Sequence, residues 1–192
     1  MNTQKNLLIA SSLLLATPVM AHTGHGVQGF ESGLTHPFMG IDHLIAMLTV
    51  GVWSALALNN QRWLGPATFV GGMSLGAILG LNGVALPFLE PSIALSVVVM
   101  GLLLLAFSRV TTQASLGLIG LFALFHGNAH GLEAPLGGTV AMYMAGFLLS
   151  TSLLHVAGLG FGSVLRTQVQ RWLVPALGGG ISLVGMWLLL AQ

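Results

Sequence analysis

The sequence contains no cysteine and very little charge. Without cysteine there are no disulfides, thiolate metal sites, iron–sulfur clusters or cysteine nucleophiles. Charged residues make up 5% of the 192 residues, whereas soluble domains carry about 25%. The only lysine is Lys5 and no G-x-x-x-x-G-K-[ST] motif is present, which excludes a P-loop nucleotide site. A net charge of +1 gives no basis for binding nucleic acid.

The residues that are present are mostly apolar, at 55% of the chain, with a mean hydropathy of +0.92. This composition predicts an integral membrane protein. The first 21 residues have the pattern of a cleavable signal peptide: Lys5, a short apolar stretch over residues 7–16, and small Ala21 at the cleavage position. The alternative is an uncleaved anchor helix, which Pro18 and the short apolar stretch disfavour.

The mature chain, residues 22–192, is predicted to be a single all-α membrane domain. Six apolar segments have about the 17–25 residues that a helix needs to cross a bilayer. They cover residues 37–58, 63–81, 91–107, 114–130, 139–165 and 172–191. Short connections predict that consecutive helices run antiparallel. The opposed polar motifs of the first and fourth segments hint at two inverted three-helix halves, although no matching sequence supports a repeat.

The arginines give this bundle an orientation. All four fall in connections on the same side of the predicted bundle, at Arg62, Arg109, Arg166 and Arg171. Because Lys and Arg concentrate in cytoplasmic loops, this side is predicted to face the cytoplasm. The acidic residues Glu31, Glu90 and Glu133 fall on the other side. Export of the signal peptide also places the mature N-terminus outside, and six spans return the C-terminus to that side.

Polar residues interrupt the first apolar segment. His36 precedes Pro37 as a plausible helix cap, and Asp42 and His43 follow five or six residues inside the predicted helix. A carboxylate at that depth costs about 2.5–3.5 kcal/mol on insertion scales. No arginine falls on this half of the bundle, so Asp42 is expected to pair with a metal ion or a protonated histidine.

The fourth segment ends in "FHGNAHGLE", with His126 and His130 one helical turn apart on the same face. Glu133 continues that face if the helix persists past Gly131. The two segments run in opposite directions, so these histidines lie at the same depth as Asp42 and His43. Imidazoles at i and i+4 can share a metal ion, and a divalent metal site between the two segments is predicted. The alternative is that the histidines are hydrogen-bonded packing residues.

Three further histidines are candidates for metal capture or relay. His22 and His25 in "HTGHG" would give the mature N-terminus a small chelator, while His155 lies inside the fifth segment, where a packing role is the alternative. On the second segment, Gly72, Gly76 and Gly80 form a ridge of small residues that would allow another helix to approach closely.

At these motifs the sequence resembles the HupE/UreJ family of hydrogenase- and urease-accessory membrane proteins. The resemblance covers nearly the whole mature chain and rests on "HPFMGIDHLIAM" and "FHGNAHGLE". It implies a six-helix metal permease of the bacterial inner membrane, with both mature termini periplasmic. The implied metal site is His36, Asp42, His43, His126, His130 and Glu133. The implied cargo is Ni²⁺, with Co²⁺ or Zn²⁺ as alternatives, for hydrogenase or urease maturation through cytoplasmic nickel chaperones.

The sequence therefore predicts a secondary transporter or facilitated channel without a permanently bound cofactor, and not an enzyme. Imidazole and carboxylate ligands suit Ni, Zn, Cu or Fe, whereas the thiolates that favour Cu(I) are absent. Three alternatives stay open at this point. They are an intramembrane zinc-dependent hydrolase with Glu133 as general base, a haem-binding electron-transfer bundle, and a metal-binding accessory protein without transport.

Overall fold

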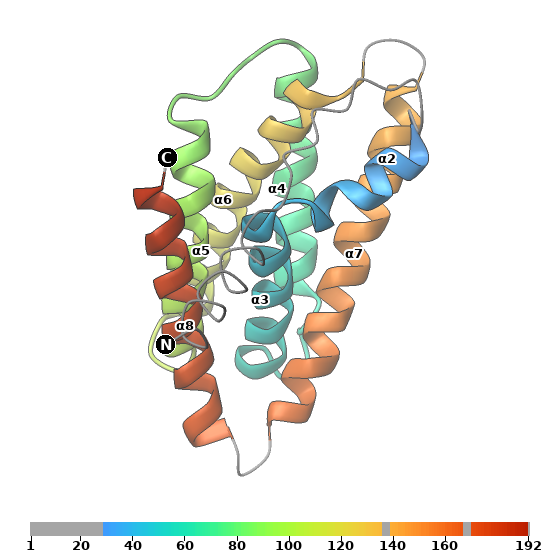
Figure 1. Ribbon diagram of the computed structural model, residues 1–192. Coiled ribbons are helices and arrows are strands. Elements are labelled where there is room, and N and C mark those ends of the chain that lie inside the picture. The colour runs from blue at the N-terminus through green and yellow to red at the C-terminus, as the bar shows by residue number, and fades with distance from the viewer. Residues whose placement is uncertain (1–28, 136–138, 167–169, 192) are drawn as a thin grey trace, which may run out of the picture.

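The computed structural model describes residues 29–135, 139–166 and 170–191 (Figure 1). Within these ranges every regular element is helical and no strand occurs. The elements are α2 (Phe30–Thr35), the 3-10 helix η1 (His36–Phe38), α3 (Ile41–Ala57), α4 (Leu64–Leu81), α5 (Leu89–Leu105), α6 (Thr112–Glu133), α7 (Val140–Leu165) and α8 (Gln170–Leu190). The predicted signal peptide, His22 and His25 lie outside the described residues.

The helices have the character of a multi-pass membrane protein. Three are long and apolar enough to cross a bilayer: α4, α7 and the Trp172–Leu190 part of α8. The α2–η1 segment and α3 qualify together as a fourth, bent by 81°. Of the other two, α5 is apolar but has 17 residues, and α6 carries His126, Asn128 and His130. Helices α3 to α8 still correspond one to one with the six predicted segments.

The first predicted segment, residues 37–58, is not one continuous helix. The chain forms η1 at His36–Phe38, passes through Gly40 in an extended conformation (φ −101°, ψ 120°), and begins α3 at Ile41. Asp42 was expected well inside a helix, but it lies in the first turn of α3. A carboxylate is stabilised there, because the helix N-terminus carries partial positive charge. His36 lies beyond the bend instead of capping a continuous helix.

The glycine ridge of α4 packs against α6, as a close-approach surface was expected to do. A Cβ atom at Gly76 would lie 1.9 Å from the carbonyl oxygen of Leu124, and one at Gly80 would lie 2.5 Å from that of Asn128. On α6, a Cβ at Gly127 would lie 1.8 Å from the carbonyl oxygen of Met73. The two helices are therefore in backbone contact. They run parallel, because the contact partner on α6 moves from Leu124 to Asn128 as the position on α4 moves from Gly76 to Gly80.

Glycines also set the two other main helix pairs. Gly51 of α3 faces the backbone of α7 at His155 and Leu159 in a second parallel pair, whereas Gly101 of α5 faces Gly178 of α8 in an antiparallel pair. If α3, α4 and α5 are exchanged with α6, α7 and α8 in that order, the pair of α3 with α7 becomes the pair of α6 with α4. The pair of α5 with α8 stays the same. This is the pairing that two inverted three-helix halves would give.

The α2 helix is held against α7 by another glycine crossing. A Cβ atom at Gly33 would lie 1.9 Å from the carbonyl oxygen of Tyr143, and one at Gly146 would lie 2.0 Å from that of Phe30. Figure 1 shows α2 lying across α7 near the end of the bundle at which α6 finishes. This crossing carries η1 and His36 toward the C-terminal end of α6, about a hundred residues away in sequence.

Candidate metal centre

Four histidines form a chain of ring contacts where η1, α3 and α6 meet. The ring centroids lie 4.7 Å apart for His36 and His130, 4.6 Å for His130 and His43, and 4.7 Å for His43 and His126. All three contacts are edge-to-face. His126 and His130 are fully buried. The structure thus brings together the polar residues of the first and fourth predicted segments, and His130 and His43 are the two inner members of the chain.

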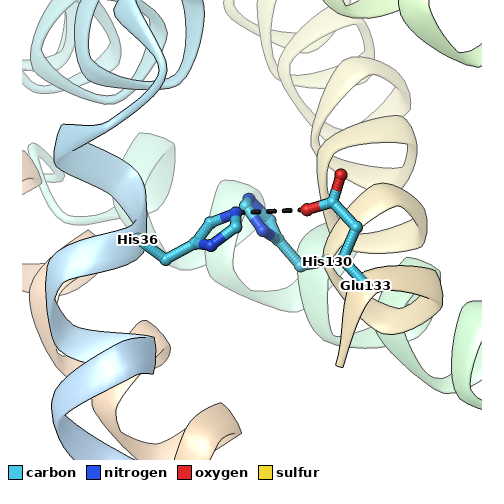
Figure 2. Close-up of side chains that lie close together, drawn as sticks. All are labelled: His36, His130 and Glu133. Atoms are coloured by element: carbon cyan, nitrogen blue, oxygen red, sulfur yellow. Dashed lines mark ion pairs between the residues drawn. The ribbon is translucent and has the colours of Figure 1, made fainter. Parts of the chain in front are cut away.

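At the solvent-facing end of this chain, His36 and His130 meet Glu133. The Nε2 atom of His36 lies 3.2 Å from Oε2 of Glu133, and Figure 2 shows the His130 ring beside this pair. One ligand atom from each of the three residues lies within 4.8 Å of the other two. The side chains of His36 and Glu133 are 32% and 54% exposed, so the cluster is accessible from this end.

The sequence predicted a span over residues 114–130, but α6 continues past Gly131 and includes Glu133. Its carboxylate is therefore on the same helix face as the two histidines, as the sequence predicted for an uninterrupted helix. The carboxylate contacts Nε2 of His36, and the Glu133 side chain is 54% exposed, so a cation can reach it from solvent.

Asp42 finds its partner in the adjacent residue. The Nδ1 atom of His43 donates a 2.7 Å hydrogen bond to Oδ1 of Asp42, and the backbone N–H of His43 donates to the same oxygen at 2.7 Å. Of the two partners expected for this carboxylate, a metal or a histidine, the structure shows a histidine. A Cβ at Gly40 would lie 2.7 Å from the same Oδ1 atom, so glycine leaves room for this arrangement.

Hydrogen bonds at Nδ1 leave the Nε2 lone pairs free. Nδ1 of His126 donates to the carbonyl oxygen of Phe122 at 2.9 Å, as Nδ1 of His43 donates to Asp42. In the described part of the chain, Nε2 of His43, Nε2 of His126 and both ring nitrogens of His130 are buried without a hydrogen-bond partner. Leaving such atoms unpaired costs about 1–3 kcal/mol each, whereas a bound cation would satisfy one lone pair on each of the three histidines. A hydrogen-bonded packing role would predict partners for these four nitrogens, and the described residues supply none.

Aromatic side chains enclose the cluster on the α7 and α4 sides. The ring centroid of Phe147 lies 3.8 Å from that of His130, and Phe69 lies 5.6 Å from His126. Tyr143 lies 5.9 Å from His36 and stacks on Phe147. Tyr143 was not predicted as a site residue, because one aromatic residue in an apolar helix has no informative spacing. The signal available was that Tyr143 is the only tyrosine in the chain.

Asn128, between the two histidines of α6, was also missed. Its fully buried side chain donates to the carbonyl oxygens of Val84 at 2.7 Å and Gly76 at 3.3 Å, and it accepts from the backbone N–H of Leu86 at 2.9 Å. Asn128 therefore ties α6 to α4 and to the connection between α4 and α5. It fixes the rotation of α6 about its axis, and hence the direction in which His126 and His130 point.

Replacing Asn128 with leucine should destabilise the protein by about 2–4 kcal/mol, because three backbone groups, one in a buried and two in part-buried hydrogen bonds, lose their partner at once. The loss should be visible as a lower thermal midpoint of the detergent-solubilised protein. Asn82→Leu is the matched control, since Asn82 donates one exposed hydrogen bond within its own helix. Equal midpoints for the two variants would contradict the structural role given to Asn128.

His155, the remaining described histidine, is not part of this cluster. It lies on α7, and the ring of Phe69 is in contact with both His155 and His126, at centroid distances of 5.0 and 5.6 Å. The described metal-binding candidates therefore divide into the clustered residues His36, Asp42, His43, His126, His130 and Glu133, and the separate His155.

Comparison with known proteins gives one consistent result. A family model described as HupE / UreJ protein matches residues 9–188. A curated relative, Protein HupE of Rhizobium leguminosarum bv. viciae, is 38% identical over 179 residues, which are 93% of this chain and 94% of the relative. No solved structure matches the chain.

Proposed function

Because the chain belongs to the HupE/UreJ family, we propose that it carries a divalent transition-metal ion, with Ni²⁺ as the favoured cargo, across the bacterial inner membrane. The observation that supports this most is the convergence of four histidines, three of which, His43, His126 and His130, have a buried ring nitrogen without a hydrogen-bond partner in the described structure. A transported cation would bind these nitrogens at the end of the bundle where Glu133 is exposed.

The donor set supports a borderline divalent ion. His36, His130 and Glu133 would receive the ion first, because two of these three side chains are accessible to solvent. His43 and His126 would then bind it through Nε2, and Asp42 would hold His43 in the required tautomer as carboxylates do for metal-ligating histidines. In this proposal Asp42 orients the ligand His43, in addition to its predicted role as a ligand.

The proposed membrane arrangement has six spans, α3 to α8. Arg166 at the end of α7 donates a hydrogen bond to Asn59 in the connection after α3, so these two ends lie together, and they would face the cytoplasm. The histidine cluster would then open to the periplasm, where both mature termini would lie. His22 and His25 would capture the ion there after removal of the signal peptide.

The driving force in this proposal is the membrane potential. A divalent ion that moves inward gains about 4.6 kcal/mol per 100 mV, twice the value for a single charge. Binding must stay modest for the ion to leave, and a site without thiolates meets that demand. The delivered Ni²⁺ would supply hydrogenase or urease maturation through cytoplasmic nickel chaperones, and the transporter itself would not be an enzyme.

The test is voltage-driven metal uptake into proteoliposomes, with Ni²⁺, Co²⁺ and Zn²⁺ compared. Uptake by the unaltered protein should respond to the imposed voltage, and His43→Ala should reduce it by more than about 100-fold, since a ligand should matter more than the 10–100-fold effect of an outer-shell partner. Asp42→Ala should fall within that 10–100-fold range, because it acts through His43.

Glu31→Gln is the matched control, because Glu31 is an exposed carboxylate on the neighbouring α2 helix and lies outside the cluster. Its uptake should equal that of the unaltered protein. Undiminished uptake by His43→Ala would refute the site. Metal binding without voltage-dependent uptake would refute transport and identify an accessory protein that only binds metal.

A further inference from the structure

His155 is prepared for ligation in the same way as His126, although it lies outside the cluster. Its side chain is 1% exposed, and its Nδ1 atom donates a 2.7 Å hydrogen bond to the carbonyl oxygen of Thr151, one turn earlier in α7. Its Nε2 atom is buried and has no hydrogen-bond partner within the described residues. His126 has the same bond to its own helix and the same free nitrogen. The proposed function so far gives His155 no role.

One aromatic ring separates the two histidines. The fully buried ring of Phe69 contacts His126 at a centroid distance of 5.6 Å and His155 at 5.0 Å. The chain of ring contacts that begins at His36 therefore continues through Phe69 to His155. By the rise of an α-helix, His155 lies about 15 Å from the end of α7 at which Arg166 is found.

On its other side, His155 borders a cavity between α4 and α7. This cavity has a volume of about 260 Å³ and is lined by His155, Ser152 and Val156 of α7 together with Trp63, Pro66 and Val70 at the start of α4. A second cavity, of about 320 Å³, shares Trp63 and Val156 with the first and reaches Arg62. The second cavity lies further along α7, toward the end of the bundle opposite the histidine cluster.

From this geometry we propose that His155 is a second, inner binding station for the transported divalent metal. Its Nε2 atom would receive the ion from His126 past Phe69 and pass it on toward the end of the bundle at which Arg166 lies. The inference rests on the proposed transport function and adds a route to it. A single imidazole suits such a station, because an ion held by one protein ligand and water leaves more readily than one held by several.

The test compares Ni²⁺ binding and voltage-driven Ni²⁺ uptake in the full-length protein and its His155→Leu variant. At equilibrium, the unaltered protein should bind a tight equivalent at the cluster and a weaker second equivalent. His155→Leu should lose the weaker equivalent and keep the Kd of the tight one within about twofold. Uptake should fall at least about tenfold, the lower bound for losing a group that supports a metal site.

Two controls separate ligation from packing. Ser74→Ala, a polar-to-apolar change on α4 at a hydroxyl that bonds only within its own helix, should leave binding and uptake unchanged. The metal-free thermal midpoint of His155→Leu should change little, because the lost Nδ1 hydrogen bond to Thr151 is offset by removal of the unpaired buried Nε2 atom. Unchanged uptake by His155→Leu, or an uptake loss matched by weaker binding at the cluster, would overturn the inner station while leaving the proposed function intact. No uptake by the unaltered protein would refute the proposed function itself.

Discussion

His130→Leu should abolish metal binding without lowering the stability of the metal-free protein. His130 contacts both His36 and His43, with ring centroids 4.7 and 4.6 Å away, and it is the residue that joins the solvent-facing group to the buried pair. Its removal leaves His36 with Glu133 on one side and His43 with His126 on the other. Ni²⁺ affinity should therefore fall by more than about 100-fold, beyond the range for an outer-shell residue.

The stability half of this prediction follows from the unpaired nitrogens. Neither ring nitrogen of His130 has a partner among the described residues, so leucine removes two buried polar atoms and breaks no hydrogen bond. Contact with Phe147 would be kept by a side chain of similar size. A functional residue that costs stability in the unbound state is expected where binding requires unsatisfied groups.

Thermal unfolding with and without metal measures both halves at once. At a Ni²⁺ concentration of about 100 times Kd, the unaltered protein should gain about 2.7 kcal/mol of stability, and His130→Leu should gain less than about 0.4 kcal/mol. Its metal-free midpoint should equal or exceed that of the unaltered protein. A marked drop in the metal-free midpoint would show that His130 serves packing, and a retained metal-induced shift would remove it from the site.

Gly127→Ala should destabilise the protein and weaken metal binding, although it adds one methyl group. The new Cβ would lie 1.8 Å from the carbonyl oxygen and 2.6 Å from the carbonyl carbon of Met73. These are backbone atoms, so α4 and α6 must move apart. Overpacking of this kind costs about 1–3 kcal/mol. Since Gly127 follows His126 directly, the displacement should also shift His126 and His130 away from His43.

Gly117→Ala supplies the matched control on the same helix. No atom lies within 4 Å of a Cβ built at Gly117, and alanine is a better helix former than glycine by up to about 1 kcal/mol. The two identical substitutions should therefore change the thermal midpoint in opposite directions, and only Gly127→Ala should reduce Ni²⁺ affinity. Equal effects from both would mean that α4 and α6 are not in backbone contact at Gly127.

Much of the candidate site could be predicted from the sequence because its polar residues stand out in an apolar chain. The four-residue spacing of His126 and His130 places both side chains on one face of any helix. Opposite directions for the first and fourth segments place Asp42 and His43 at the same end. These inferences need only helical geometry and the high cost of burying an uncompensated polar group.

Other parts of the site depend on contacts that spacing does not encode. Nothing in the sequence shows that Asp42 binds its neighbour His43 and leaves Nε2 free, since either residue can adopt several rotamers. The 81° bend before α3 was missed, because apolar composition continues through Gly40. Phe69 and Tyr143 lie near the histidines only because their helices pair in the folded protein, so the sequence could not predict these contacts.

By itself, the sequence determined that this protein is a helical, apolar chain with histidines and carboxylates near one end, and it identified its family. Hydropathy and helical period carry that information, because both are properties of single segments. The tertiary structure alone decided which helices pair, and it paired α4 with α6 and α3 with α7 through glycines that permit backbone contact. Those pairings, with the crossing of α2 on α7, place His36, His43, His126 and His130 in one cluster and leave His155 beyond Phe69, because the position of a side chain between helices depends on the surfaces of both.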